Sequence, residues 1–124
     1  MKPVTHDDIV RWVEKINKKF DRNTDGWSVY WVETLIARGA KPELYDDWYL
    51  IWIITPDAWG NNRLAVLSCG CDNVGAFRQM QHRIEQIAHE NECQYIEQGS
   101  ELDDKYNEWL VRQGYKPHIF KKEV

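Results

Sequence analysis

The chain has 124 residues, of which 43% are hydrophobic and 29% charged, and its formal net charge is -4. This length suits one domain spanning residues 1–124 with a real core, and this composition is wrong for a disordered chain. The negative charge and the lack of a long basic stripe argue against a nucleic-acid binder. No apolar run could span a bilayer and no secretory signal opens the chain, so we expect a cytoplasmic protein without a membrane partner.

The first third of the chain predicts two helices. Thr5 and Asp8 resemble a capping box, and apolar residues then recur at helical spacing over residues 9–20. A second helix is expected over residues 28–38, with Gly39 as its stop.

Two strands are expected in the middle of the chain. Residues 41–47 are polar and contain Pro42, which predicts a loop. Residues 48–55 are apolar on both faces and predict a strand in the sheet interior. A break over residues 56–62 leads to a second strand over residues 63–69, most simply antiparallel to the first.

The second half alternates helices with strands. Asp72 and Asn73 can cap a third helix, and residues 93–97 then form a short strand. A right-handed crossover would make that strand parallel to the one before the helix. A fourth helix is expected to end at Gly114, and a last strand follows over residues 115–122. The chain therefore predicts a single α/β domain, a mixed sheet with helices on both faces.

This order of elements resembles the GCN5-related N-acetyltransferase (GNAT) superfamily. Residues 2–9, Lys-Pro-Val-Thr-His-Asp-Asp-Ile, resemble the family's opening. Residues 108–117, Glu-Trp-Leu-Val-Arg-Gln-Gly-Tyr-Lys-Pro, resemble the Phe-Tyr-x-Lys-x-Gly-Phe-x-Pro signature that closes its last helix. The resemblance implies the acyl-CoA N-acyltransferase fold and transfer of an acetyl group from acetyl-CoA to a primary amine. The acceptor would be a small-molecule or protein amine, and a homodimer is compatible with the family.

The resemblance places the pyrophosphate of acetyl-CoA at residues 72–77, where the third helix begins. Backbone N–H groups and the positive end of a helix dipole would receive the phosphates. The residues expected to bind the cofactor there are Asn73, Gly75, Ala76 and Arg78. On the preceding strand, the amides of Leu67 and Cys69 would polarise the thioester. An ordinary capped turn is the alternative interpretation of this loop.

Three residues depart from the family's pattern. Asp72 puts a carboxylate beside the pyrophosphate, and Phe77 crowds a position that is usually small. Leu110 stands where the family often has the tyrosine that protonates the departing thiolate. Tyr106, one turn earlier, is expected as a catalytic residue, with a core aromatic as the alternative. The base that deprotonates the amine could be Glu97, the pair Asp46 and Asp47, or a water held at the central strands, with a surface or capping carboxylate as the alternative for each residue.

Other functions stay open at this point. The runner-up is a GNAT-shaped protein that has lost its chemistry and serves as a structural or interaction module with a protein partner. Small divergent proteins of this kind are carried by tailed phages, which would place the chain in the host cytoplasm or the virion. An open cleft between the strands that flank the third helix would favour the enzyme, whereas Phe77 or Trp109 filling it would favour the module. A weaker third idea, an acidic protein that blocks a nucleic-acid enzyme, depends on net charge alone.

No metal site is expected. Cys69, Cys71 and Cys93 are most simply small core residues in a reducing compartment, because zinc would need two more ligands. Three polar residues on the third expected helix could bind a metal, but they are more simply interpreted as part of the solvent-exposed face of that helix. The trio is His82, Glu85 and His89.

Overall fold

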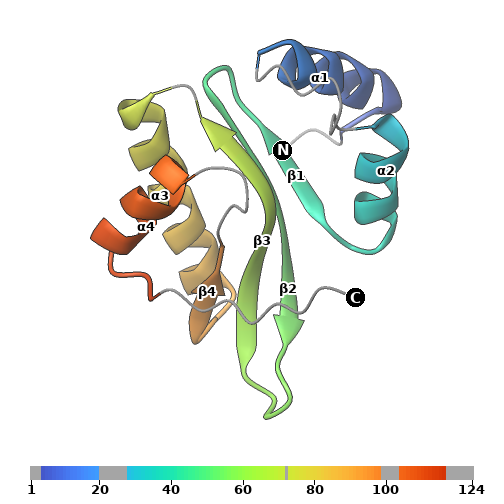
Figure 1. Ribbon diagram of the computed structural model, residues 1–124. Coiled ribbons are helices and arrows are strands. Elements are labelled where there is room, and N and C mark those ends of the chain that lie inside the picture. Colours follow the sequence, from blue (N-terminus) through green and yellow to red (C-terminus); the bar gives the residue numbers. More distant parts are fainter. Residues whose placement is uncertain (1–3, 20–27, 72, 99–103, 117–124) are drawn as a thin grey trace, which may run out of the picture.

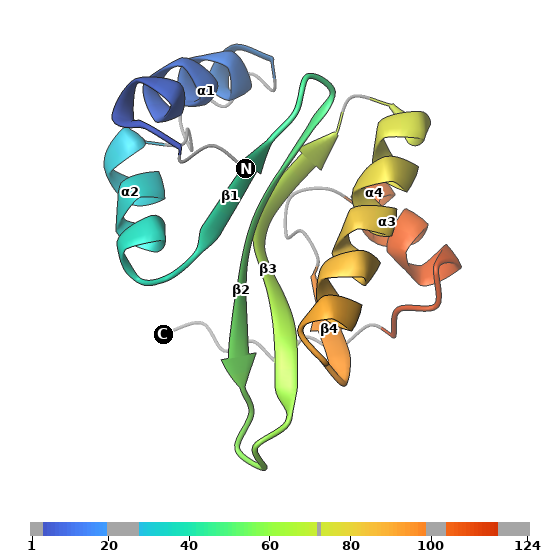
Figure 2. The same cartoon turned by 180° about the vertical axis from the view of Figure 1, so that it is seen from behind.

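The computed structural model describes residues 4–19, 28–71, 73–98 and 104–116. The elements are α1 (His6–Lys19), α2 (Val29–Ala37), β1 (Lys41–Leu44), β2 (Trp48–Pro56), β3 (Asn62–Cys71), α3 (Val74–Glu90), β4 (Tyr95–Glu97) and α4 (Asp104–Arg112). The strands form one sheet in the order β1-β2-β3-β4. Helices α1 and α2 lie on one side of the sheet and α3 and α4 on the other, as Figures 1 and 2 show. The mixed sheet with helices on both faces is therefore confirmed.

Local capping signals set the first two helices. The backbone N–H of Thr5 donates to Asp8 Oδ2 at 3.0 Å, and the N–H of Asp8 donates to Thr5 Oγ1 at 3.2 Å. These bonds complete the predicted capping box and lower the pKa of the Asp8 carboxyl. Ser28 caps α2 by accepting the N–H of Trp31 at 2.9 Å, and Gly39 follows with a φ of 102°. Both helices lie where the sequence predicted them.

The loop predicted over residues 41–47 is wrong, because its first four residues form β1. This strand pairs antiparallel with β2 and lies at the edge of the described sheet, where Pro42 costs little because an edge strand does not need every N–H. The loop was predicted partly because Glu43 is a charged residue. Its side chain is nevertheless only 3% exposed, because Arg83 of α3 pairs with it. A contact distant in sequence therefore overrides the local polar pattern.

Strand β2 lies in the sheet interior, as its apolar run predicted, and serves two cores. Its alternate residues Trp48, Leu50 and Trp52 pack with α3, whereas Tyr49 and Ile51 pack with α1 and α2. The partner strand β3 is antiparallel to β2 and parallel to β4, so both predicted pairings are confirmed. The last strand predicted over residues 115–122 lies mostly outside the described residues, and residues 115–116 are not in a strand.

Gly70 of β3 is required by the aromatic packing on the α1 side. A Cβ atom at Gly70 would lie 2.4 Å from Cε1 of Tyr49, whose buried ring also makes an edge-to-face contact with Trp12 at 5.0 Å between the ring centroids. We expect Gly70→Ala to lower the free energy of unfolding by about 1–3 kcal/mol, the usual cost of overpacking a core. Urea denaturation would measure the change. Ser68→Ala on the same strand is the control, and equal stability of both variants would contradict this packing.

Candidate functional site

The candidate site lies where β3 and β4 part. The two strands pair through only three residue pairs, Arg63↔Tyr95, Leu64↔Ile96 and Ala65↔Glu97. Beyond this point, which we call the fork, β3 continues over residues 66–71 with no described strand on its β4 side. Alternate backbone N–H and C=O groups along that stretch point away from β2, toward the side where β4 has ended. This side of β3 is therefore a candidate position for a ligand.

A β-bulge re-aims the backbone of β3 just past the fork. Ile51 pairs with Ser68 whereas Trp52 pairs with Val66, so Leu67 is an extra residue without a partner on β2. Such a bulge bends the strand and turns its peptide groups out of the regular ladder. The amides of Leu67 and Cys69 are those expected to polarise the thioester, and both residues lie on this stretch. The bulge itself was not predicted, because it depends on the pairing register.

The N-terminus of α3 follows directly at the end of β3. Asn73 caps it, as predicted: its Oδ1 accepts the N–H of Ala76 at 2.8 Å. Among the described residues no acceptor receives the backbone N–H of Val74 or Gly75. Arg78 is exposed one turn further along. Two N–H groups and the positive end of the helix dipole thus lie at an exposed helix end that can receive an anion, with Arg78 on the same helix.

Ala76 and Phe77 have other contacts in the structure than those expected from the sequence. The N–H of Ala76 is already bonded to the capping side chain, so the donors left for a phosphate are those of Val74 and Gly75. Phe77 is buried and contacts Trp109 of α4, with 4.9 Å between the ring centroids. Its ring therefore lies in the core between α3 and α4. Asp72, the other departure in the loop, lies outside the described residues.

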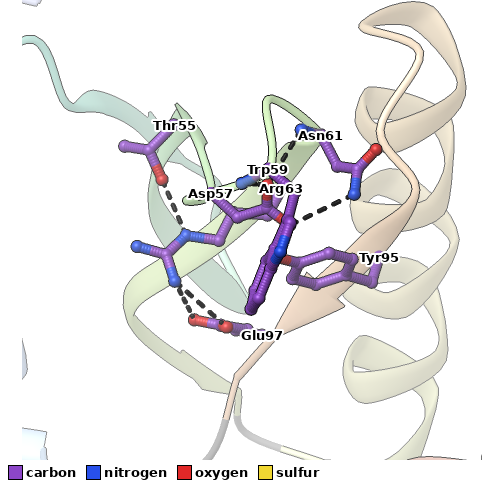
Figure 3. Close-up of polar contacts among 7 residues, drawn as sticks. All are labelled: Thr55, Asp57, Trp59, Asn61, Arg63, Tyr95 and Glu97. Atoms are coloured by element: carbon purple, nitrogen blue, oxygen red, sulfur yellow. Dashed lines mark hydrogen bonds and ion pairs between the residues drawn. The ribbon is translucent and has the colours of Figure 1, made fainter.

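Glu97 lies at the fork on the face of the sheet opposite α3. Its neighbour Ile96 packs into the α3 core, so the next side chain along β4 points to the other face. Arg63 Nη1 donates to both carboxylate oxygens of Glu97, at 3.2 and 3.3 Å, and Arg63 Nε donates to Thr55 Oγ1 at 2.9 Å (Figure 3). These contacts hold an exposed carboxylate at the fork. Its expected role as a base stays a prediction.

The turn between β2 and β3 is tied to β4 beside this carboxylate. Asp57 Oδ1 accepts the N–H groups of Trp59 and Asn61 at 2.8 and 2.9 Å, and Asp57 Oδ2 accepts the Tyr95 hydroxyl at 2.7 Å (Figure 3). The Tyr95 bond, with the turn N–H groups, lowers the pKa of Asp57, and the same bond raises the pKa of Tyr95. The turn is therefore a fixed platform, from which the Trp59 side chain projects 86% exposed.

The residues around the expected proton donor differ from the family's pattern. Leu110 is 4% exposed and belongs to the α3 core. Tyr106 lies on α4, but its side chain is outside the described part of the chain, so its catalytic role stays a prediction.

Sequence reasoning missed a second tyrosine. The Tyr115 hydroxyl accepts a hydrogen bond from Gln98 Nε2 at 2.6 Å, and Gln98 Nε2 also donates to Gln81 Oε1 at 2.8 Å. We call these three residues the Tyr115 cluster. The one signal in the sequence is a tyrosine where the family's signature has phenylalanine.

The other candidates from the sequence give no site. The side chains of His82, Glu85 and His89 are all exposed, as a solvated helix face requires. Within the described ranges no three His, Cys, Asp or Glu residues gather as metal ligands, and Cys69, Cys71 and Cys93 are thiols rather than disulfides. None of the described helices combines the length and the apolar character needed to cross a membrane.

Solved acetyltransferases share this architecture over nearly the whole chain. An acetyltransferase of Trypanosoma brucei matches with a TM-score of 0.68 at 11% identity, over 99% of this chain and 96% of that chain. A ribosomal-protein-alanine N-acetyltransferase of Brucella melitensis biovar Abortus matches with a TM-score of 0.68 at 12% identity, over 96% and 93%. No protein-family model and no curated protein matches the sequence. At such identities the likeness shows the fold alone, and that fold is the GNAT fold predicted from the order of elements.

Proposed function

We propose that this chain is an acetyltransferase that moves an acetyl group from acetyl-CoA to a primary amine. The observation that carries the proposal is the order of two features along the chain: the bulge at Leu67 on β3, and the start of α3 at Val74 just beyond the end of that strand. The first places backbone amides beside the fork, and the second has two N–H groups without described acceptors at a helix N-terminus. A thioester carbonyl and a pyrophosphate need these two kinds of donor.

The chain's own residues divide the work as follows. The N–H groups of Val74 and Gly75, with Arg78, bind the pyrophosphate. The amides near Leu67 and Cys69 bind the carbonyl oxygen, on which negative charge develops as the amine attacks. Glu97, on the opposite face of the fork, takes the proton that the amine loses. Holding both reactants at the fork supplies the rest of the rate enhancement. A protein doing this chemistry would work in the cytoplasm.

Amine-dependent release of free thiol tests this function. The purified chain would be incubated with acetyl-CoA and a panel of polyamines, amino acids and lysine peptides, and each product's mass would be measured. We expect at least one amine to gain one acetyl group as CoA is released. The control omits the amine, because hydrolysis also releases thiol. Thiol release that no amine on the panel increases would contradict the proposal.

A second candidate, an interaction module without chemistry, is favoured by the contact between Phe77 and Trp109. This contact joins α3 to α4, and the exposed Trp59 offers a large apolar side chain to a protein partner. The two candidates differ in one property that can be measured. The module would not bind acetyl-CoA, whereas the enzyme must.

A further inference from the structure

Transfer of an acetyl group from acetyl-CoA includes a step in which the leaving thiolate must be protonated by an acid. When the tetrahedral intermediate collapses, the C–S bond breaks and the CoA sulfur leaves as a thiolate that needs a proton. Leu110 occupies the position where the family often has the donor, and its side chain is buried in the core and has no proton to give. The proton therefore has to come from another group, either Tyr106, whose side chain lies outside the described residues, or a group that the structure describes at the fork.

Tyr115 lies next to the position that lost the donor. Gly114, with a φ of 96°, turns the chain back after α4, and the N–H of Tyr115 then donates to the carbonyl oxygen of Leu110 at 3.1 Å. The phenol reaches Gln98, which is the first residue of the chain past the fork on the β4 side. Tyr115 and Cys69 of β3 both pack against the α3 core. The hydroxyl is thus on the α3 side of the fork.

The hydrogen bonds of the Tyr115 cluster have a direction. Gln98 Nε2 has two hydrogens, and it donates one to Gln81 Oε1 and the other to the Tyr115 oxygen. Gln81 is 6% exposed and returns a bond to Gln98 Oε1 at 3.3 Å, which fixes the amide. The Tyr115 oxygen is therefore an acceptor in this bond and keeps its own hydrogen to donate. The same N–H would stabilise the phenolate that remains after the proton has left.

We propose that Tyr115 is the acid that protonates the departing CoA thiolate, and that Gln81 and Gln98 position it. This inference depends on the proposed function. The amine nitrogen forms a bond to the acetyl carbon and loses a proton to Glu97, the C–S bond breaks, and the sulfur takes the Tyr115 proton. Water returns a proton to the phenolate, and Glu97 gives its proton to water. The products are the acetamide and free CoA.

The surroundings suit this role. Burial raises the pKa of Tyr115, and Glu85 and Cys69 raise it further, while the Gln98 hydrogen bond lowers it; the net shift is upward. The phenol is therefore protonated at neutral pH, as an acid must be before the reaction. The amine and its base would meet the thioester from the Glu97 face, while the thiolate would leave on the α3 face, where Tyr115 is.

The test is Tyr115→Phe, which installs the residue that the family's signature has at this position and should therefore fold. We expect kcat with acetyl-CoA to fall about 10²- to 10⁴-fold while KM for acetyl-CoA is unchanged. With a small aryl thioacetate as donor, whose acidic thiolate leaves without a proton, variant and wild type should react at the same rate. Tyr30→Phe, an exposed tyrosine on α2, is the control and should match the wild type with both donors.

Adding Leu110→Tyr to Tyr115→Phe would return a donor to the family's position, and we expect part of the lost kcat to return. Wild-type kcat in Tyr115→Phe would overturn the inference. An equal loss with both donors would also overturn it, because a merely structural role would slow both reactions. A wild-type chain that transfers no acetyl group to any amine would instead contradict the proposed function, and this inference with it.

Discussion

Replacing Arg83 with methionine should lower the free energy of unfolding by about 3–5 kcal/mol, the cost of leaving one charge of a buried pair alone. Arg83 Nε and Nη2 donate to the two carboxylate oxygens of Glu43 at 2.8 and 3.0 Å. Trp52 and Tyr45 donate to the same carboxylate at 2.9 and 2.8 Å, but neither carries a positive charge. Methionine fills a similar volume, so the loss would measure the charge and its hydrogen bonds. Urea denaturation at neutral pH is the measurement.

The pH dependence of this variant gives a second check. Burial acts to raise the pKa of Glu43, but hydrogen bonds from Arg83, Tyr45 and Trp52 outweigh it and lower the pKa. A lowered pKa means that the carboxylate stabilises the wild type above the pKa of the unfolded chain, and that this stability is lost as the pH falls through the folded value. The difference between the wild type and Arg83→Met should therefore shrink in acid.

Arg11→Met is the matched control for this prediction. Arg11 pairs with Asp8 on the exposed face of α1, where an ion pair contributes about 0–1 kcal/mol. Equal costs for the two substitutions would contradict the account of Glu43 as a buried, charge-paired residue that joins β1 to α3.

Glu97→Gln should lower kcat about 10²- to 10⁴-fold, the range that a general base contributes. Glutamine keeps the shape of the side chain, and its oxygen can still accept from Arg63, but it cannot take a proton from the amine. Acetyl-CoA affinity should be unchanged, because Glu97 is on the face opposite α3. Steady-state kinetics on the best amine, together with a separate binding titration, would measure both quantities.

Glu90→Gln, at the exposed C-terminal end of α3, controls for the loss of one negative charge. We expect wild-type kcat from it. If Glu97→Gln also had wild-type kcat, another group or a bound water would be the base, and the carboxylate at the fork would be structural.

The sequence was sufficient where a structure depends on neighbouring residues. The capping box of Thr5 and Asp8 and the Asn73 cap each join groups three residues apart, so the pattern alone predicts the bond. The apolar run of β2 likewise predicted its interior place, since both faces of an interior strand are covered.

The sequence was insufficient where contacts between distant residues decide the outcome. Glu43 is forty positions before Arg83, so nothing local shows that β1 buries a carboxylate. The bulge at Leu67 follows from the β2–β3 register, which no single strand's sequence reveals. The Tyr115 cluster joins α3, the end of β4 and the chain after α4, so its three polar side chains looked unrelated in the sequence.

Titration with acetyl-CoA in a calorimeter tests the central claim most directly, because binding does not depend on finding the right amine. We expect a dissociation constant on the order of micromolar for the wild type. Arg78→Ala should weaken it, since it removes a charge beside the Val74 and Gly75 N–H groups. A chain that gives no heat with acetyl-CoA at roughly millimolar concentration would contradict the claim and favour the interaction module.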